Sequence, residues 1–428
     1  MKILERGIYL IVFCLPLYLV RFSILNTPTT LLELMIYGLF VFWLIKARWR
    51  GIKEVVIKIK KIVLPIVLIL IGVSVATIFS WNLRLSAGIW KAWFIDPILF
   101  FIVVSSIIKK PEQVAKVFYS LIFSGFVVSV VSLIYLIFGK LDESGRLQGF
   151  YTSPNYLAMY LAPVLIIGLF FVWTKIICPK TRVGNPASCR ALSRPRPDRA
   201  LGLQEVFLTN NLRPNFLFFV ACILLLVACL FLTKSFGAWL GIILALVFGL
   251  IAYLSKSKPA QGWSASGGKL IWGIIFCLLA IVLIFGFLKI NSIQGKLSFN
   301  SRLEIWQRAS DIFKLYPIIG IGPGTFHDFF IPYPRWGVPQ PHNLYLAFLL
   351  QTGIIGFIGF IWLIVWFFRT GFKNLFKVYS SEFIVILMSV MVYILIHGLV
   401  DTTYWKNDLS AMFWLTIGLM AILKKNPD

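Results

Sequence analysis

The chain has 428 residues, of which 59% are hydrophobic and only 13% are charged. A soluble protein of this length cannot bury so much apolar surface, so the composition excludes the soluble globular class. The apolar runs are about 20 residues long, which suits helices that cross a bilayer. They do not alternate apolar with polar residues as the strands of a membrane barrel do. We therefore predict an all-α polytopic integral membrane protein.

The formal net charge of +25 raises the question of a nucleic-acid partner. Most Lys and Arg residues fall in short segments between apolar runs, such as KARWRGIKEVVIKIKK at 46–61. Basic segments of this kind face the cytoplasm and anionic lipid. No folded basic domain remains to bind nucleic acid. The charge pattern predicts membrane lipids as partners, no nucleic acid, and a topology with both termini in the cytoplasm.

Hydropathy predicts about twelve spans. Their approximate extents are 7–20, 31–45, 62–79, 94–108, 117–138, 156–173, 215–232, 236–254, 270–288, 344–368, 383–400 and 409–423. The chain then divides into an N-terminal transmembrane bundle (1–288), a long external loop between spans nine and ten (289–343), and three C-terminal spans (344–428). An Arg- and Pro-rich cytoplasmic insertion at 174–214 has the composition of a disordered segment.

The external loop contains a predicted amphipathic helix, SRLEIWQRASDIFKLYP. Ser301 and Glu304 have the spacing of a capping box, and apolar residues recur at helical spacing as far as Pro317. Such a helix is expected to lie on the outer membrane surface. Three glycines follow, of which Gly322 and Gly324 predict tight backbone turns.

His342 and Asn343 stand where this loop enters span ten. Free N–H groups and the helix dipole favour anions at a helix start, and a histidine side chain can accept a proton near neutral pH. Arg302 and Arg308 precede it in the loop, and guanidinium groups suit pyrophosphate oxygens. These groups could serve proton transfer beside a lipid-linked phosphate. The alternative is an interfacial histidine that binds only water or headgroups.

Two further ionisable residues, His397 and Asp401, lie four positions apart near the outer end of span eleven, and the spacing predicts a shared helix face. The carboxylates assigned to the external side show no DxD spacing, and the chain has no CxxC or nucleotide-binding motif. Metal dependence is therefore disfavoured, and no cofactor is expected.

Several motifs occur in order along the chain. SRLEIWQRASDIFKLYPIIGIGPGTF is followed by HNLYLAFLLQTGIIG, and this region resembles the signature of the O-antigen ligase and O-antigen polymerase superfamily. The earlier segment GRLQGFYTSPNYLAMYLAP, with Arg146 and Asn155, resembles a second, weaker motif of the same superfamily.

The resemblance implies a GT-C-like helical fold and an enzyme of the bacterial cytoplasmic membrane with an outward-facing site. Such an enzyme moves a glycan, with inversion, from undecaprenyl pyrophosphate to an acceptor hydroxyl of a lipid, glycan or protein, without metal. It implies that His342 is the catalytic base and that Arg302 binds the donor pyrophosphate. We assign Lys234, Arg146 and Arg308 to the same pyrophosphate. Supporting roles are expected for Asn343, Gly322, Gly324, Asn155, His397 and Asp401.

One motif departs from the superfamily. Members commonly show T-x-S-R-G-A-W between spans seven and eight, whereas this chain reads TKSFGAW, with Phe236 at the arginine position. Lys234 can supply charge there, but as a point charge rather than a planar fork. A polymerase and a protein O-oligosaccharyltransferase stay open as alternatives within the class. A transporter or flippase of lipid-linked substrates, and a non-catalytic relic, are the alternatives outside it.

Overall fold

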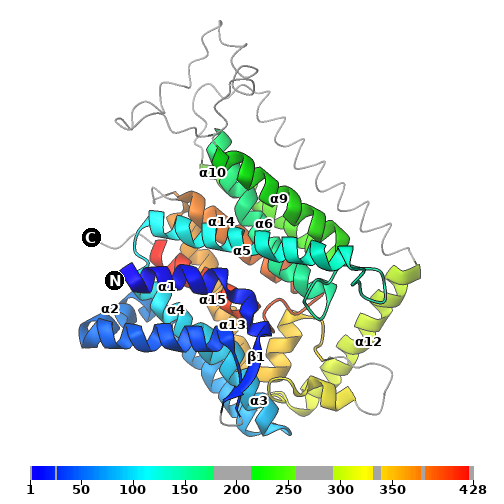
Figure 1. Cartoon of the computed structure of the whole chain (residues 1–428). Coiled ribbons are helices and arrows are strands. Elements are labelled where there is room, and N and C mark those ends of the chain that lie inside the picture. Colours follow the sequence, from blue (N-terminus) through cyan, green and yellow to red (C-terminus); the bar gives the residue numbers. More distant parts are fainter. Residues whose placement is uncertain are drawn as a thin grey trace, which may run out of the picture.

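The computed structural model describes residues 2–24, 27–177, 214–256, 293–330, 339–376 and 381–423. These residues form a helical bundle with one short β-hairpin (Figure 1). Predicted span 270–288 and nearly all of the insertion at 174–214 lie outside the described residues.

The elements follow one another in the order shown by Figure 1. The α-helices are α1 (Lys2–Phe13), α2 (Leu31–Ile78), α3 (Leu83–Trp90), α4 (Asp96–Ile107), α5 (Pro111–Ile137), α6 (Pro154–Ile177), α9 (Pro214–Leu232), α10 (Phe236–Lys256), α12 (Ile293–Leu315), α13 (Leu344–Leu375), α14 (Ser381–His397) and α15 (Asn407–Leu423). The shorter elements are the 3₁₀ helices η1 (Leu15–Leu19) and η4 (Thr325–Phe330), the π-helical turn η2 (Lys91–Ile95), and the strands β1 (Arg21–Ile24) and β2 (Thr27–Thr30).

Six of the described helical segments are long and apolar enough to cross a membrane. They are Gly51–Ile78, Leu83–Ile107, Pro111–Ile137, Pro154–Val172, Phe236–Tyr253 and Leu344–Leu375. Three shorter apolar helices, Leu217–Leu232, Glu382–His397 and Asn407–Leu423, coincide with predicted spans seven, eleven and twelve. The helical membrane class is therefore confirmed, whereas the count of twelve spans and the GT-C-like relationship stay predictions.

The first predicted span differs from the structure. Helix α1 ends at Phe13 instead of continuing to residue 20, and the short helix η1 follows with Pro16 in its first turn. Proline lacks the N–H that an α-helix interior requires, so the α-helical run stops there. The chain then forms the antiparallel hairpin β1–β2, which the all-α prediction did not include.

Predicted spans two and three form one helix, α2, so the expected loop at 46–61 is wrong. Lys, Arg, Ala and Glu favour helices, and that segment contains no proline. Val55 and Ile59, one turn apart, are both buried and give the segment an apolar face. The side chain of Thr30 caps the helix start by accepting the N–H of Glu33.

Helices α2 and α13 approach so closely that their backbones are in contact. A Cβ atom on Gly72 of α2 would lie 2.4 Å from the backbone nitrogen of Gly356 on α13. A Cβ on Gly359 would lie 2.7 Å from the carbonyl oxygen of Pro65. Small residues permit this close approach between membrane helices. The glycines thus fix α13, whose start adjoins the candidate site, against the longest of the described helices.

The predicted amphipathic helix of the external loop is present as α12, and its apolar face packs against other parts of the protein. Ile305, Ala309 and Ile312 form a small core with Ile321, Phe326 and Leu350. The predicted capping box is wrong, because α12 begins at Ile293 and Ser301 lies inside it. Its position on the membrane surface stays a prediction.

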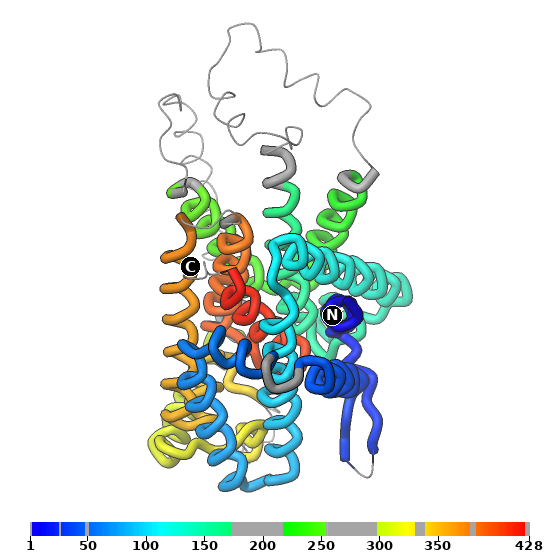
Figure 2. Tube along the Cα trace, turned by 90° about the vertical axis from the view of Figure 1, so that its left-hand side faces the viewer, coloured from blue at the N-terminus to red at the C-terminus, as the bar shows by residue number. Residues whose placement is uncertain are grey.

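Figures 1 and 2 show how α12 lies relative to the other helices. Helix α12 lies at the end of the bundle opposite the end where α6 finishes and α9 begins. The glycine turn after α12 rests on α13, since the N–H of Ile321 donates to the carbonyl of Leu350 at 2.8 Å. The predicted insertion and the predicted external loop therefore join the bundle at opposite ends.

Gly353 makes the attachment of this turn possible. It interrupts the helical geometry of α13 with φ +64° and ψ −178°, a combination that glycine alone adopts readily. A Cβ there would overlap the carbonyl oxygen of Ile318 at 2.1 Å.

We predict that Gly353→Ala lowers the free energy of unfolding by at least about 1–3 kcal/mol, because it adds this overlap to backbone strain. Thermal unfolding of the detergent-solubilised protein measures the loss. Gly38→Ala is the matched control, since a Cβ at that helical glycine meets nothing within 4 Å. Equal unfolding temperatures for both variants would contradict the prediction.

Candidate functional site

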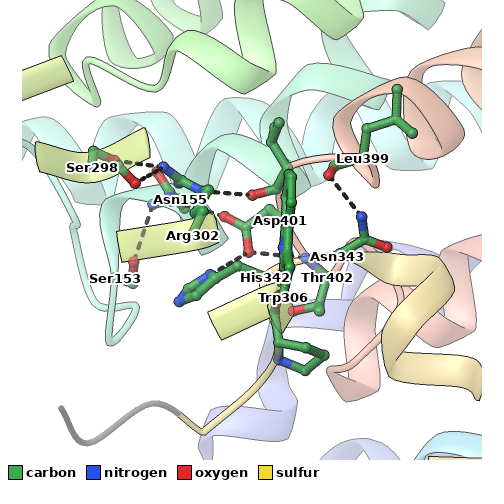
Figure 3. Close-up of polar contacts among 12 residues, drawn as sticks. Ser153, Asn155, Ser298, Arg302, Trp306, His342, Asn343, Leu399, Asp401 and Thr402 are labelled. Atoms are coloured by element: carbon green, nitrogen blue, oxygen red, sulfur yellow. Dashed lines mark hydrogen bonds and ion pairs between the residues drawn. The ribbon is translucent and has the colours of Figure 1, made fainter. Parts of the chain in front are cut away.

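Several of the predicted site residues meet where four segments of the chain come together (Figure 3). These segments are α12, the stretch 339–343 before α13, the turn 398–406 between α14 and α15, and the start of α6. Figure 3 shows Arg302, His342, Asn155 and Asp401 gathered around one point.

His342 faces Asp401, which is 59 residues away in the sequence. The imidazole Nδ1 lies 3.3 Å from the carboxylate Oδ1, and the two side chains are 34% and 4% exposed. A neutral imidazole that donates from Nδ1 leaves Nε2 as a proton acceptor. His342 therefore combines a buried anionic partner with an accessible basic nitrogen.

The backbone around His342 is fixed by the start of α13. Asn343 caps the helix, because its Oδ1 accepts the N–H groups of Tyr345 and Leu346, each at 3.0 Å. Its Nδ2 donates to the carbonyl of Leu399 at 3.0 Å, and the N–H of Leu344 donates to Gly398 at 2.7 Å. The segment that carries His342 is thus bonded to the turn that carries Asp401.

His342 itself has a φ of +46°, a conformation that non-glycine residues seldom adopt. Such strain persists where the surrounding structure over-determines the backbone, and it is common at functional sites. The contacts of Asn343 and Leu344 supply that constraint.

Asp401 is ionised although it is buried. Burial alone would raise the pKa of its carboxyl, but the hydrogen bond and charge of His342, the charge of His397 and the N–H of Thr402 together lower it. The Thr402 N–H donates to Oδ1 at 2.9 Å, and Asn155 Nδ2 donates to Oδ2 at 2.8 Å. Both carboxylate oxygens are therefore hydrogen-bonded.

Arg302 lies beside this pair, on α12. Its Nε donates to the carbonyl of Val400 at 3.2 Å, and Nη1 donates to the side chain and carbonyl of Ser298. Trp306, one turn later, donates from Nε1 to the carbonyl of Pro341 at 3.1 Å. These bonds attach α12 to both segments that carry the His342–Asp401 pair, so the guanidinium is held next to it.

Arg146 lies on the opposite side of Asn155 from Asp401. Its Nη2 donates to Asn155 Oδ1 at 2.7 Å, and its Nε donates to the carbonyl of Thr233 at 2.8 Å. Burial lowers the pKa of Arg146 and repulsion from Arg302 acts in the same sense, while the carboxylates of Asp142 and Asp401 oppose them.

The motif that departs from the superfamily, TKSFGAW, therefore touches an arginine from another segment. Lys234 is exposed, has a φ of +49°, and donates from Nζ to the carbonyl of Gly145 at 3.1 Å. It lies close to Arg146 in space, because Gly145 and Arg146 are neighbours in the chain.

Two predicted supporting residues, Gly322 and Gly324, are placed elsewhere. A Cβ on Gly322 would meet Ser80 and Ala76 of the α2 end, and one on Gly324 would meet Ile89 of α3. These two glycines therefore hold the turn after α12 on the bundle rather than lining the site. Arg308 is partly buried, and its Nε is buried with no hydrogen-bond partner among the described residues.

His397 and Asp401, which were expected to share a helix face, have different side-chain partners. Helix α14 ends at His397, whose Nδ1 lies 2.7 Å from the hydroxyl of Tyr393. The side chain of Asp401, in the following turn, faces His342 instead. Helical spacing fails here because the helix ends before Asp401 is reached.

Sequence reasoning missed the contact between Asp401 and His342, and also the Val400 carbonyl and the Thr402 N–H. The two main-chain groups leave no signal in the sequence. Asp401 does leave one, because few carboxylates are assigned to the external side and a histidine base commonly has a carboxylate partner.

A family described as O-Antigen ligase matches residues 221–361, about a third of the sequence. The chain carries an O-antigen ligase domain. The resemblance to the O-antigen ligase superfamily is thereby confirmed, and the apolar helices agree with a multi-pass membrane protein. No curated protein sequence matches the chain.

The matched region contains His342, Asn343, Arg302 and Lys234, but it ends before Asp401 and begins after Asn155. The O-antigen ligase domain thus supplies one half of the site, and the flanking helices supply the other. The match supports an enzyme in a broad sense.

Phe236→Arg tests the departure in TKSFGAW. Because Arg146 already bonds the turn at Thr233, we expect the added arginine to change the rate of glycan transfer by no more than about two- to threefold. The comparison is between the purified natural chain and the variant. Transfer only by the substituted form would contradict this expectation and favour the relic alternative.

Proposed function

We propose that the chain is an inverting, metal-independent glycan transferase that acts as an O-antigen ligase. Its donor is a glycan on undecaprenyl pyrophosphate, and its acceptor is a hydroxyl group. The observation that carries the proposal is the His342–Asp401 pair beside Arg302, within a domain of the O-antigen ligase family.

His342 acts as the general base in this proposal. Nε2 takes the proton of the acceptor hydroxyl while the acceptor oxygen attacks the anomeric carbon of the donor sugar. A new glycosidic C–O bond forms and the bond to pyrophosphate breaks, with inversion at the anomeric carbon. Undecaprenyl pyrophosphate leaves with the bonding electrons, and the imidazolium later returns its proton to solvent.

Asp401 orients the base and stabilises the imidazolium. It accepts from Nδ1, which leaves Nε2 free for the acceptor, and its negative charge compensates the positive charge that forms on the ring. The lowered pKa of Asp401 keeps this charge in place at neutral pH.

Arg302 is assigned to the donor pyrophosphate. A guanidinium group can bind two phosphate oxygens and compensate the charge that develops on the leaving group. Arg308 and Lys234 are proposed as further cationic contacts on the same donor. The undecaprenyl chain would lie in the surrounding lipid, next to the apolar helices.

The proposed location is the cytoplasmic membrane of a bacterium, with both termini in the cytoplasm and the site facing outward. The support for this orientation is the distribution of Lys and Arg in the segments outside 46–61, which lies inside α2.

We expect His342→Ala to reduce glycan transfer by about 10²- to 10⁴-fold, because the variant lacks the general base. Transfer is measured with the purified protein, the lipid-linked glycan extracted from a strain that lacks the gene, and membranes of that strain as acceptor. His327→Ala is the matched control, since His327 lies exposed in η4. A His342→Ala protein that is folded and fully active would end the proposal.

Deletion of the gene separates the ligase from its alternatives. We expect full-length lipid-linked polymer to accumulate and surface glycan to be lost, because a ligase acts after the chain is complete. Mass analysis of the lipid-linked intermediates makes the measurement. Single repeat units would indicate a polymerase, and unglycosylated proteins would indicate a protein O-oligosaccharyltransferase. Transport of lipid-linked glycan by the protein in vesicles, without a covalent product, would favour a flippase.

A further inference from the structure

We propose that Asn155 and Arg146 are positioning residues for the base, through a hydrogen-bonded chain of four side chains that runs from Arg146 to His342. This inference rests on the proposed function, because it assumes that His342 accepts the proton. Arg146 then positions the base instead of binding the donor pyrophosphate.

The hydrogen-bonded chain of side chains is continuous, and each of its three links is within hydrogen-bonding distance. Arg146 Nη2 lies 2.7 Å from Asn155 Oδ1, and Asn155 Nδ2 lies 2.8 Å from Asp401 Oδ2. Asp401 Oδ1 lies 3.3 Å from His342 Nδ1. Three separate parts of the chain, far apart in sequence, are linked in this way.

Asn155 suits its place because its two ends differ. Its carbonyl oxygen accepts from a cation, and its amide nitrogen donates to an anion. The reverse orientation would place N–H groups against the guanidinium and an oxygen against the carboxylate. The charges of Arg146 and Asp401 therefore fix the amide, and the amide fixes the second oxygen of Asp401.

Arg146 is held by the segment at the end of α9, so it is a fixed end of the hydrogen-bonded chain of side chains. Its Nε donates to the carbonyl of Thr233, and the N–H of the next residue, Leu147, donates to the carbonyl of Leu232 at 3.0 Å. The loop between α5 and α6 is thus bonded to the end of α9. Two of the guanidinium nitrogens, Nε and Nη2, are engaged in these contacts, so the side chain of Arg146 is held in one place.

Charged groups face the pair from several elements, and their signs determine the test. Arg146 and Asp142 belong to the loop after α5, Arg302 to α12, and His397 to the end of α14. Loss of a positive charge near His342 favours the imidazolium, and loss of the Asp401 charge disfavours it. Variants on the two sides of Asn155 should therefore shift the pH dependence in opposite directions.

The experiment compares transfer by purified variants across pH, with lipid-linked glycan from the gene-deletion strain as donor. We expect Arg146→Gln and Asn155→Asp each to lower kcat about 10- to 100-fold, because the base is then held less accurately against the acceptor. In both variants the acid-side inflection of the kcat profile should move to higher pH. Asp401→Asn should move it to lower pH, and Arg146→Lys should restore part of the lost rate.

Lys140→Ala is the matched control, because Lys140 lies exposed in the same loop and its Nζ contacts only the ring of Tyr135 among the interactions of the described residues. Asn155→Asp keeps the shape of the side chain, so it tests the chain of hydrogen bonds if Arg146→Gln does not fold. An increased KM for the donor with unchanged kcat and pH profile would overturn the proposal and return Arg146 to donor binding. If His342→Ala is inactive while all the Arg146 and Asn155 variants keep the natural kcat and pH profile, the positioning role fails and the proposed function stands.

Discussion

The attachment of the α13 start to the turn after α14 is the constraint on which the candidate site depends. Asn343 and Leu344 bond the carbonyls of Leu399 and Gly398, and the His342–Asp401 contact lies directly beside these bonds. The Leu344 bond joins two main-chain groups, and the bond to Leu399 depends on the side chain of Asn343. The base and its carboxylate are 59 residues apart in the sequence, and these bonds bring them together.

The remaining elements hold this attachment in place from both sides. Glycines let α2 approach α13 closely, and the turn after α12 bonds α13 at Leu350. This turn also sets the position of α12, and Arg302 on α12 donates to the carbonyl of Val400. Packing at a distance from the chemistry therefore determines how far the guanidinium lies from the imidazole, which is the quantity on which catalysis by positioned groups depends.

Much of this fold could be predicted from the sequence, and the failures have physical causes. Hydropathy located the apolar helices because burial in lipid acts on composition directly. It could not show that residues 46–61 continue α2, since charged residues that favour helices also occur in loops. The β-hairpin at 21–30 has no apolar alternation long enough to signal strands.

The site shows the same division. His342 and Arg302 were found because a histidine at a helix start and an arginine on an amphipathic helix can be recognised locally. The contact between Asp401 and His342 could not be found in this way. Helical spacing indicated His397 as the neighbour of Asp401, but helix α14 ends at His397 and Asp401 contacts His342. The contact of TKSFGAW with an arginine is also visible only in space, where Arg146 from another loop donates to the carbonyl of Thr233.

An ionised carboxylate that is only 4% exposed at the end of a membrane bundle requires compensation, since the desolvation of such an ion costs on the order of several kcal/mol. Asp401 receives it from two neutral donors, the Thr402 N–H and the Asn155 amide, and from one titratable partner, His342. The neutral donors do not change with the protonation state of the ring. The negative charge therefore persists while His342 gains and loses a proton, which is the condition that a carboxylate must meet to support a base through a complete cycle.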